Sequence, residues 1–117
     1  MKEYLFIFRG GDPNWSTGSP EQSQTHMQRW NGWMESIAKA GRLVGGKPLE
    51  RTGKQVTGIR KTVSDGPFAE GKELVGGYLI IKADSYEEAV GIAKGCPILE
   101  LETGTVEVRA IQEVPGM

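Results

Sequence analysis

Thiol and imidazole groups are almost absent from this sequence of 117 residues, which contains one cysteine, Cys96, and one histidine, His26. A single cysteine excludes a disulfide within the chain. A structural zinc site takes four ligands, mostly of these two types, so no such site is expected here. We therefore expect no bound metal, and we expect no cofactor.

A charge excess of one sign and a long hydrophobic run are missing as well. Fourteen basic side chains stand against fifteen acidic ones, giving a net charge of −1, which disfavours binding to the phosphates of nucleic acid. No stretch approaches the ~20 apolar residues that span a bilayer. The apolar run near the N-terminus, residues 4–8, is too short for the core of a signal peptide, and no small-residue cleavage site follows it. We expect a cytoplasmic protein that binds neither nucleic acid nor membrane.

Glycine, in contrast, is abundant. The length fits one domain over residues 1–117, and 38% apolar with 25% charged residues is ordinary for a globular domain. Seventeen glycines are about twice the usual share, and they follow no period. Three pairs, Gly10-Gly11, Gly45-Gly46 and Gly76-Gly77, follow or interrupt strand-like runs. At such places a missing side chain lets another backbone or a ligand approach closely.

Hydrophobic periodicity and capping signals predict seven elements. A first helix begins at Pro20, after the cap residue Ser19, and ends at Gly41; a second begins at the capping box of Ser85 and Glu88 and ends at Gly95. The predicted strands cover residues 3–9, 42–49, 55–63, 73–83 and 103–114. In the third of these strands, the candidate inward residues are Val56, Ile59 and Val63.

This order predicts an α+β protein with the ferredoxin-like βαββαβ layout, in which two helices cover one face of an antiparallel sheet. The other face would be left in water, although the first strand is apolar at every position from Tyr4 to Phe8. Both faces of that strand therefore require burial. A second copy of the chain can supply the missing cover, so we expect a homodimer whose sheets pack face to face.

Residues Gly41 to Lys47 match the spacing GxxxxGK of a phosphate-binding loop. That motif requires a strand before it and Ser or Thr after it, whereas here a helix is predicted before it and Pro48 follows. The segment is better explained by a helix end at Gly41 and a strand interrupted by two glycines.

Four side chains have a structural and a functional interpretation each. His26 lies one helical turn before Trp30, where it can act as a general base at the mouth of a pocket or pack between helix and sheet. Cys96 is either a reactive thiol or a small buried residue. Trp30 belongs either to the core or to a binding cleft. Trp15 lies in a polar, glycine-containing loop and is a candidate lid over a pocket.

The most distinctive stretch is Asp65-Gly66-Pro67-Phe68-Ala69-Glu70. Asp65 can cap a turn at residues 64–67, and Phe68 can fill an apolar site or a seam between two subunits. The functional alternative makes Asp65 or Glu70 an acid or base in catalysis.

With Gly76-Gly77-Tyr78-Leu79-Ile80 after it, this stretch resembles the signature of the DGPF family, part of the YCII-related group. The resemblance implies a ferredoxin-like fold paired into a dimeric α/β barrel. Some members are encoded beside, or fused to, extracytoplasmic-function sigma factors, which implies such a factor as a partner. YCII-type relatives carry a His–Asp pair proposed as an active site, and the matching positions here hold Trp30 and Cys96. His26, one turn away from Trp30, is a candidate substitute.

Two functions remain open. The first is a dimeric protein that binds a small molecule in a cleft and has an accessory or regulatory role; its candidate ligand-binding residues are Trp15, Trp30, Phe68 and Cys96. The second is a cofactor-independent enzyme, similar to an isomerase or a small monooxygenase. In that case His26 is the base and Asp65 or Glu70 is its partner. Sequence-specific DNA binding is disfavoured by the acidic pI.

Overall fold

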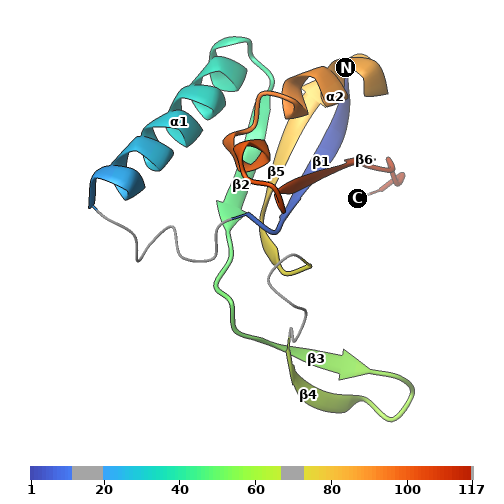
Figure 1. Cartoon of the computed structure of the whole chain (residues 1–117). Helices are drawn as coiled ribbons and strands as arrows, with labels where there is room; N and C mark the ends of the chain where they lie inside the picture. The colour runs from blue at the N-terminus through green and yellow to red at the C-terminus, as the bar shows by residue number, and fades with distance from the viewer. Residues whose placement is uncertain (12–19, 67–72, 117) are drawn as a thin grey trace.

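The computed structural model describes residues 1–11, 20–66 and 73–116. Its centre is an antiparallel sheet of four strands in the order β2-β5-β1-β6 (Figure 1). Each outer strand pairs with one of the two central strands. The strands are β1 (Lys2–Arg9), β2 (Leu43–Pro48), β5 (Val75–Ala83) and β6 (Thr105–Ala110).

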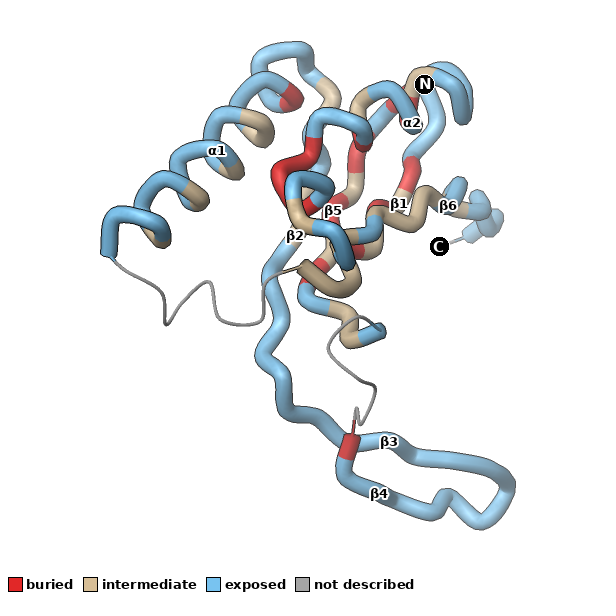
Figure 2. The backbone as a smooth tube through the Cα atoms, in the orientation of Figure 1, coloured by how far each residue is buried: buried red, intermediate tan, exposed pale blue. Residues whose placement is uncertain are grey.

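Both long helices pack on the same face of this sheet. They are α1 (Pro20–Lys39) and α2 (Tyr86–Ala93), and the short 3-10 helix η1 (Pro97–Glu100) follows α2. Ile37 of α1 and Ala89 of α2 are buried in one cluster with Phe6 and Ile81 of the central strands (Figure 2). The layering and the strand order confirm the predicted ferredoxin-like α+β fold.

The predicted helix ends are confirmed where the structure describes them. Gly41 takes a φ of +75°, which ends α1 in the left-handed conformation that glycine favours. The hydroxyl of Ser85 accepts a hydrogen bond from the N–H of Glu88 at 3.1 Å and caps α2. The carboxylate of Glu88 completes the box by accepting from the N–H of Asp84, one residue earlier than the standard pattern.

Side chains along β1 alternate between two environments. Tyr4, Phe6 and Phe8 are buried beneath the helices, whereas Leu5 and Ile7 are only half-buried on the opposite face. Tyr78 and Ile80 of β5 share that opposite face, which we call the open face, since they pair with Ile7 and Leu5. Beside them Arg9 and Glu107 form an ion pair, and this guanidinium lowers the pKa of the Glu107 carboxyl.

The predicted single strand over residues 55–63 is wrong. The chain instead forms a hairpin of β3 (Gly53–Thr57) and β4 (Thr62–Gly66), because it reverses between Gly58 and Lys61, whose φ angles are +75° and +56°. The expectation that Val56, Ile59 and Val63 face inward is also wrong, since they are 68%, 99% and 61% exposed. The hairpin extends away from the sheet, so no core is available to them (Figure 1).

The turn predicted at residues 64–67 falls partly within this hairpin. Ser64, Asp65 and Gly66 belong to β4, and the Asp65 carboxylate forms an ion pair with Lys54 of β3 at 2.6 Å instead of capping a turn. Pro67 lies outside the described residues. In the part of the chain that is described, no helix has the length and apolar character needed to cross a membrane.

Candidate functional site

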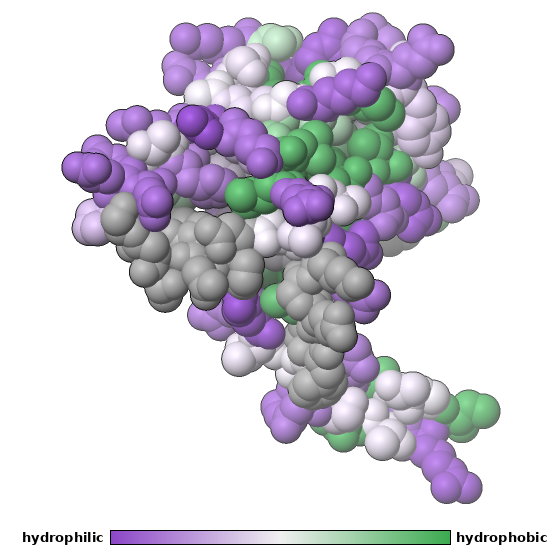
Figure 3. Space-filling view, viewed as in Figure 1, coloured by the Kyte–Doolittle hydropathy of each residue, from purple (hydrophilic) through white to green (hydrophobic). Residues whose placement is uncertain are grey.

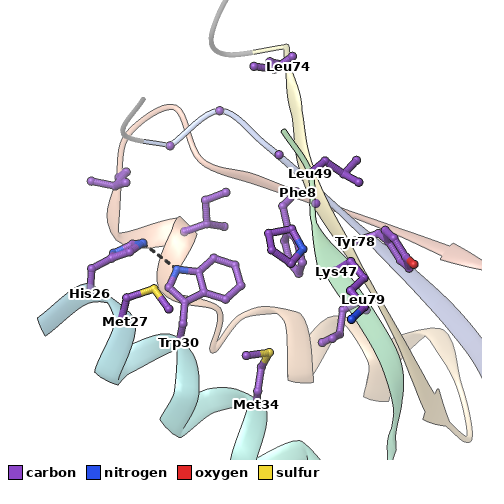
Figure 4. Close-up of a pocket in the computed structure, with 18 of the residues that line it drawn as sticks. Phe8, His26, Met27, Trp30, Met34, Lys47, Leu49, Leu74, Tyr78 and Leu79 are labelled. Atoms are coloured by element: carbon purple, nitrogen blue, oxygen red, sulfur yellow. Dashed lines mark hydrogen bonds between the residues drawn. The ribbon is translucent and has the colours of Figure 1, made fainter. Parts of the chain in front are cut away.

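A pocket of about 400 Å³ lies between α1 and the sheet (Figure 4). Its lining includes Leu49 and Arg51, which follow β2 and precede the β3–β4 hairpin. Side chains of α1 form one wall, and residues around η1 form another. Strands β1, β2 and β5 form the floor. The side chains of these two walls are His26, Met27, Trp30 and Met34 from α1, Ile98 from η1, and Leu101, which follows η1.

Two glycines make the floor of this pocket. Gly46 pairs with Leu79, and Gly77 pairs with Phe8, so both occupy positions that face the helices. A Cβ atom on Gly77 would lie 2.9 Å from the carbonyl oxygen of Lys47, and one on Gly46 would lie 2.7 Å from Cδ1 of Leu79. Strands β2 and β5 therefore require glycine here, and the missing side chains leave room above them. This is the close approach that the glycine pairs predicted.

The wall formed by α1 is held in place by aromatic contacts. The ring of Trp30 meets the ring of Phe8 edge to face, with centroids 5.1 Å apart, and the ring of Trp33 at 5.7 Å. The indole N–H of Trp33 donates to the carbonyl oxygen of Ile92 at 3.0 Å. Because these rings interlock with each other and with α2, Trp30 presents a rigid apolar surface to the pocket.

His26 and Trp30 are hydrogen-bonded to each other. The indole Nε1–H of Trp30 donates to Nε2 of His26 at 2.8 Å (Figure 4). An indole nitrogen can only donate, so Nε2 is the acceptor and the proton of the neutral imidazole sits on Nδ1. The structure therefore places His26 in the same pocket as Trp30, with the lone pair of Nε2 already engaged.

The polar side chains around the pocket are cationic or uncharged. No aspartate or glutamate lines it among the residues that the structure describes. Lys47 pairs with Tyr78 in the sheet, and side chains at this register position point to the open face. In Figure 4 the ring of Tyr78 points away from Trp30. Among the described residues, Arg51, an exposed residue in the segment between β2 and β3, therefore places a permanent positive charge at the mouth.

The other predicted site residues lie elsewhere. Cys96 is buried in the core rather than along the described pocket lining, and its burial raises the pKa of the thiol to about 12, so it stays protonated at neutral pH. Asp65 lies on the hairpin in its ion pair with Lys54. Trp15, Phe68 and Glu70 lie outside the described residues. Within the described ranges, no three His, Cys, Asp or Glu side chains gather to hold a metal ion.

Several lining residues were not predicted as site residues. Met27 and Met34 share the apolar side of α1 with Trp30, which the helical periodicity predicts, but periodicity does not distinguish a core residue from a pocket residue. Arg51 lies in the short polar segment between β2 and β3, whose sequence carries no signal of a binding site. Its proximity to Gly46 and Gly77 could be found only from the pairing of β2 with β5.

Comparisons with known proteins agree with this architecture. The family model for the YCII-related domain matches residues 7–115. Among solved structures, the chain is similar to 5-chloro-2-hydroxyhydroquinone dehydrochlorinase (TftG) from Burkholderia phenoliruptrix AC1100, in complex with 2,5-dihydroxybenzoquinone. The TM-score is 0.54 and the sequence identity 14%, over 95% of each chain. No curated protein matches the sequence at a significant level.

Proposed function

The chain belongs to the YCII-related family, and from that premise we propose that it binds a small, flat, apolar molecule that carries a negative charge, such as a phenolate or an ionised hydroxyquinone. The proposal rests on one observation. The pocket joins an aromatic and methionine-lined interior to an arginine at its mouth, and no carboxylate lines it within the described residues.

The size and the walls of the pocket support a single-ring ligand. A volume of about 400 Å³ falls in the lower part of the range typical for small-molecule sites. The floor is backbone at Gly46 and Gly77, and the wall is the fixed indole of Trp30. A planar ring can lie between them, and the thioethers of Met27 and Met34 adapt to its edge.

The charge of the ligand follows from the polar groups. Arg51 places a guanidinium at the mouth of the pocket. A cation at this position favours an acceptor that carries negative charge. The similar dehydrochlorinase structure holds 2,5-dihydroxybenzoquinone, a flat and acidic quinone, which supports this ligand class.

The alternative is a cofactor-independent enzyme, similar to an isomerase or monooxygenase, with His26 as general base. That role needs a free lone pair on the imidazole. Nε2 accepts from Trp30, and Nδ1 carries the proton, so His26 must first give up its bond to Trp30. The geometry therefore favours binding over catalysis by this histidine.

We also propose a homodimer in which two open faces pack together. Leu5, Ile7, Tyr78 and Ile80 give each open face an apolar centre that a second copy can cover. Membership of the DGPF subgroup, a cytoplasmic location and an accessory role beside an extracytoplasmic-function sigma factor stay predictions from the sequence.

The ligand proposal is tested by calorimetric titration with 2,5-dihydroxybenzoquinone, which is ionised at pH 7, and with its neutral dimethoxy analogue. We expect the ionised quinone to bind more tightly. Arg51→Gln should weaken its binding about tenfold, as expected for a charge-assisted contact that is partly screened by water, and should leave the neutral analogue within about twofold.

Arg60→Gln is the matched control, because Arg60 is an exposed arginine of the hairpin that does not line the pocket. It should leave both affinities unchanged. The proposal is contradicted if neither compound binds saturably, or if the two arginine variants behave alike.

A further inference from the structure

The β3–β4 hairpin projects from the body of the protein, and we call it the arm. Every residue from 50 to 65 is exposed, and Figure 2 shows the whole hairpin in pale blue except at Gly66. It extends from the end of β2 and leaves the body of the protein (Figure 1). An isolated two-stranded hairpin is at best marginally stable in water, so this arm needs a surface to pack on.

The arm carries apolar side chains that such a surface would cover. Val56 and Val63 lie directly opposite each other in the register of the two strands, so their side chains share one face. Ile59 lies in the reversal between the strands and is 99% exposed. Figure 3 shows hydrophobic atoms at the far end of the hairpin, where the protein has no other layer.

The overall dimensions show that the protein exposes more surface than a compact domain of the same size. The radius of gyration is 15.9 Å, whereas a compact domain of this length has about 13.4 Å. The accessible surface is 8432 Å², about 2,100 Å² more than the roughly 6,300 Å² expected for a compact monomer of this mass. A stable interface needs only about 800 Å² from each partner, so the surplus is sufficient for one.

Charge favours a second copy of this chain as the partner. Residues 50–66 hold four basic and two acidic side chains, whereas residues 84–116 hold two basic and seven acidic ones. Within the chain, Lys54 pairs with Asp65, and Glu88, Glu100 and Glu107 pair with arginines. The charges that remain for a partner are mainly the exposed Arg60 and Lys61 of the hairpin and the exposed Glu87, Glu102 and Glu113. The acidic side chains of residues 84–116 belong to α2, η1, β6 and the segments beside them. The arm points away from them in its own chain, so it can meet such a surface only on another molecule (Figure 1).

The same acidic region also offers exposed apolar side chains. Tyr86, Val90 and Leu99 are 52%, 38% and 42% exposed, and Glu87 and Glu100 are next to them in the sequence. Exposed apolar side chains with acidic residues beside them, such as Glu87, complement apolar side chains of the hairpin with the basic Arg60 and Lys61 beside them.

We propose that the β3–β4 arm packs on the acidic surface of α2, η1 and β6 of a second copy and holds the dimer together. This inference rests on the homodimer proposed above and adds to it a second contact, separate from the open face. The arm begins beside Arg51 at the mouth of the pocket. In this dimer, the pocket mouth of one subunit therefore lies next to the segment that contacts the other subunit.

The arm is tested by measuring the dimer dissociation constant with sedimentation velocity. The combined variant Val56→Ser, Ile59→Ser and Val63→Ser should raise this constant at least about tenfold, because three apolar contacts are lost. The protomer should keep its fold, since all three side chains are exposed in it, and circular dichroism checks this. The matched control is Gln55→Ser with Thr62→Ser on the other face of the hairpin, which should change the constant less than about twofold.

A variant of the open face separates this inference from the dimer itself. Ile7→Glu should also weaken the dimer. If Ile7→Glu weakens it and the arm variant does not, the arm inference is overturned and the proposed dimer stands. If the arm variant weakens it and Ile7→Glu does not, the arm is supported and the open face is not the interface. A wild-type protein that stays monomeric overturns both.

The position of the arm is measured with a polarity-sensitive dye on Ile59→Cys. The natural Cys96 is buried, so the dye attaches at the arm. Its emission should shift to shorter wavelength as the concentration passes the dimer dissociation constant. Emission typical of water in a sample that sediments as a dimer overturns the inference.

Discussion

Gly46→Ala should destabilise the protein by about 2–4 kcal/mol, since overpacking against backbone cannot relax without moving a strand. The added Cβ would lie 2.7 Å from Cδ1 and 2.9 Å from Cα of Leu79, and closer still to the carbonyl oxygen of Tyr78. Strand β2 would have to separate from β5. The free energy of unfolding, measured by denaturation in urea, checks this expectation.

Gly45→Ala is the matched control, one residue earlier in the same strand. No atom lies within 4 Å of a Cβ at this position, so the substitution should change stability by less than about 1 kcal/mol. Equal effects of the two variants would contradict the tight pairing of β2 with β5, and with it the glycine floor of the pocket.

Trp30→Ala has the second large effect. It removes the aromatic wall and the contacts with Phe8 and Trp33, so we expect a loss of about 2–4 kcal/mol in the free energy of unfolding. Binding of 2,5-dihydroxybenzoquinone should weaken by about a hundredfold, because a lost aromatic anchor dominates the energy of a small site. Titration under conditions where the variant stays folded measures the second effect.

Trp30→Phe separates the wall from its hydrogen bond. It keeps an aromatic surface but loses the N–H that His26 accepts. Affinity should stay within about tenfold of the wild type, since most of the apolar contact is kept. If Trp30→Phe lost as much affinity as Trp30→Ala, the site would depend on the His26 bond instead of on the apolar wall.

The sheet and the two helices that cover it could be predicted because local sequence rules identify them. Ser85 and Glu88 form a capping box, Gly41 ends α1, and the apolar run from Tyr4 to Phe8 forms a central strand of the sheet. The order of elements then leaves few topologies. These signals depend on residues close together in the sequence, and the structure has the caps and strands that they predict.

The hairpin could not be predicted, since its apolar residues do not obey the rule that apolar residues turn inward. Val56 and Val63 are apolar residues in a strand-like segment, but their own chain offers them no core. Lys61, a residue other than glycine with positive φ, completes the reversal and gives no signal in the sequence. If the proposed second copy covers these positions, they resemble core positions in the sequence of one chain.

The pocket could be predicted in part. The glycine pairs indicate a close approach of backbone or ligand, and the sequence marks His26 and Trp30 as candidate site residues, which the structure brings together. Their hydrogen bond, which decides which imidazole nitrogen is engaged, depends on side-chain rotamers. Arg51 reaches the pocket because β2 pairs with β5, and the local sequence around Arg51 does not reveal that pairing.

The central claim is that an anionic ring binds against Trp30, and the indole N–H signals of the protein in a ¹H–¹⁵N NMR spectrum test it most directly. Trp30→Phe assigns one of these signals by removing it. Trp33 is an internal reference, because its N–H donates to Ile92 and it is absent from the described lining. During titration with 2,5-dihydroxybenzoquinone, the Trp30 signal should move and saturate while that of Trp33 moves much less. Saturable binding that leaves the Trp30 signal in place, or no saturable change at all, would contradict the account.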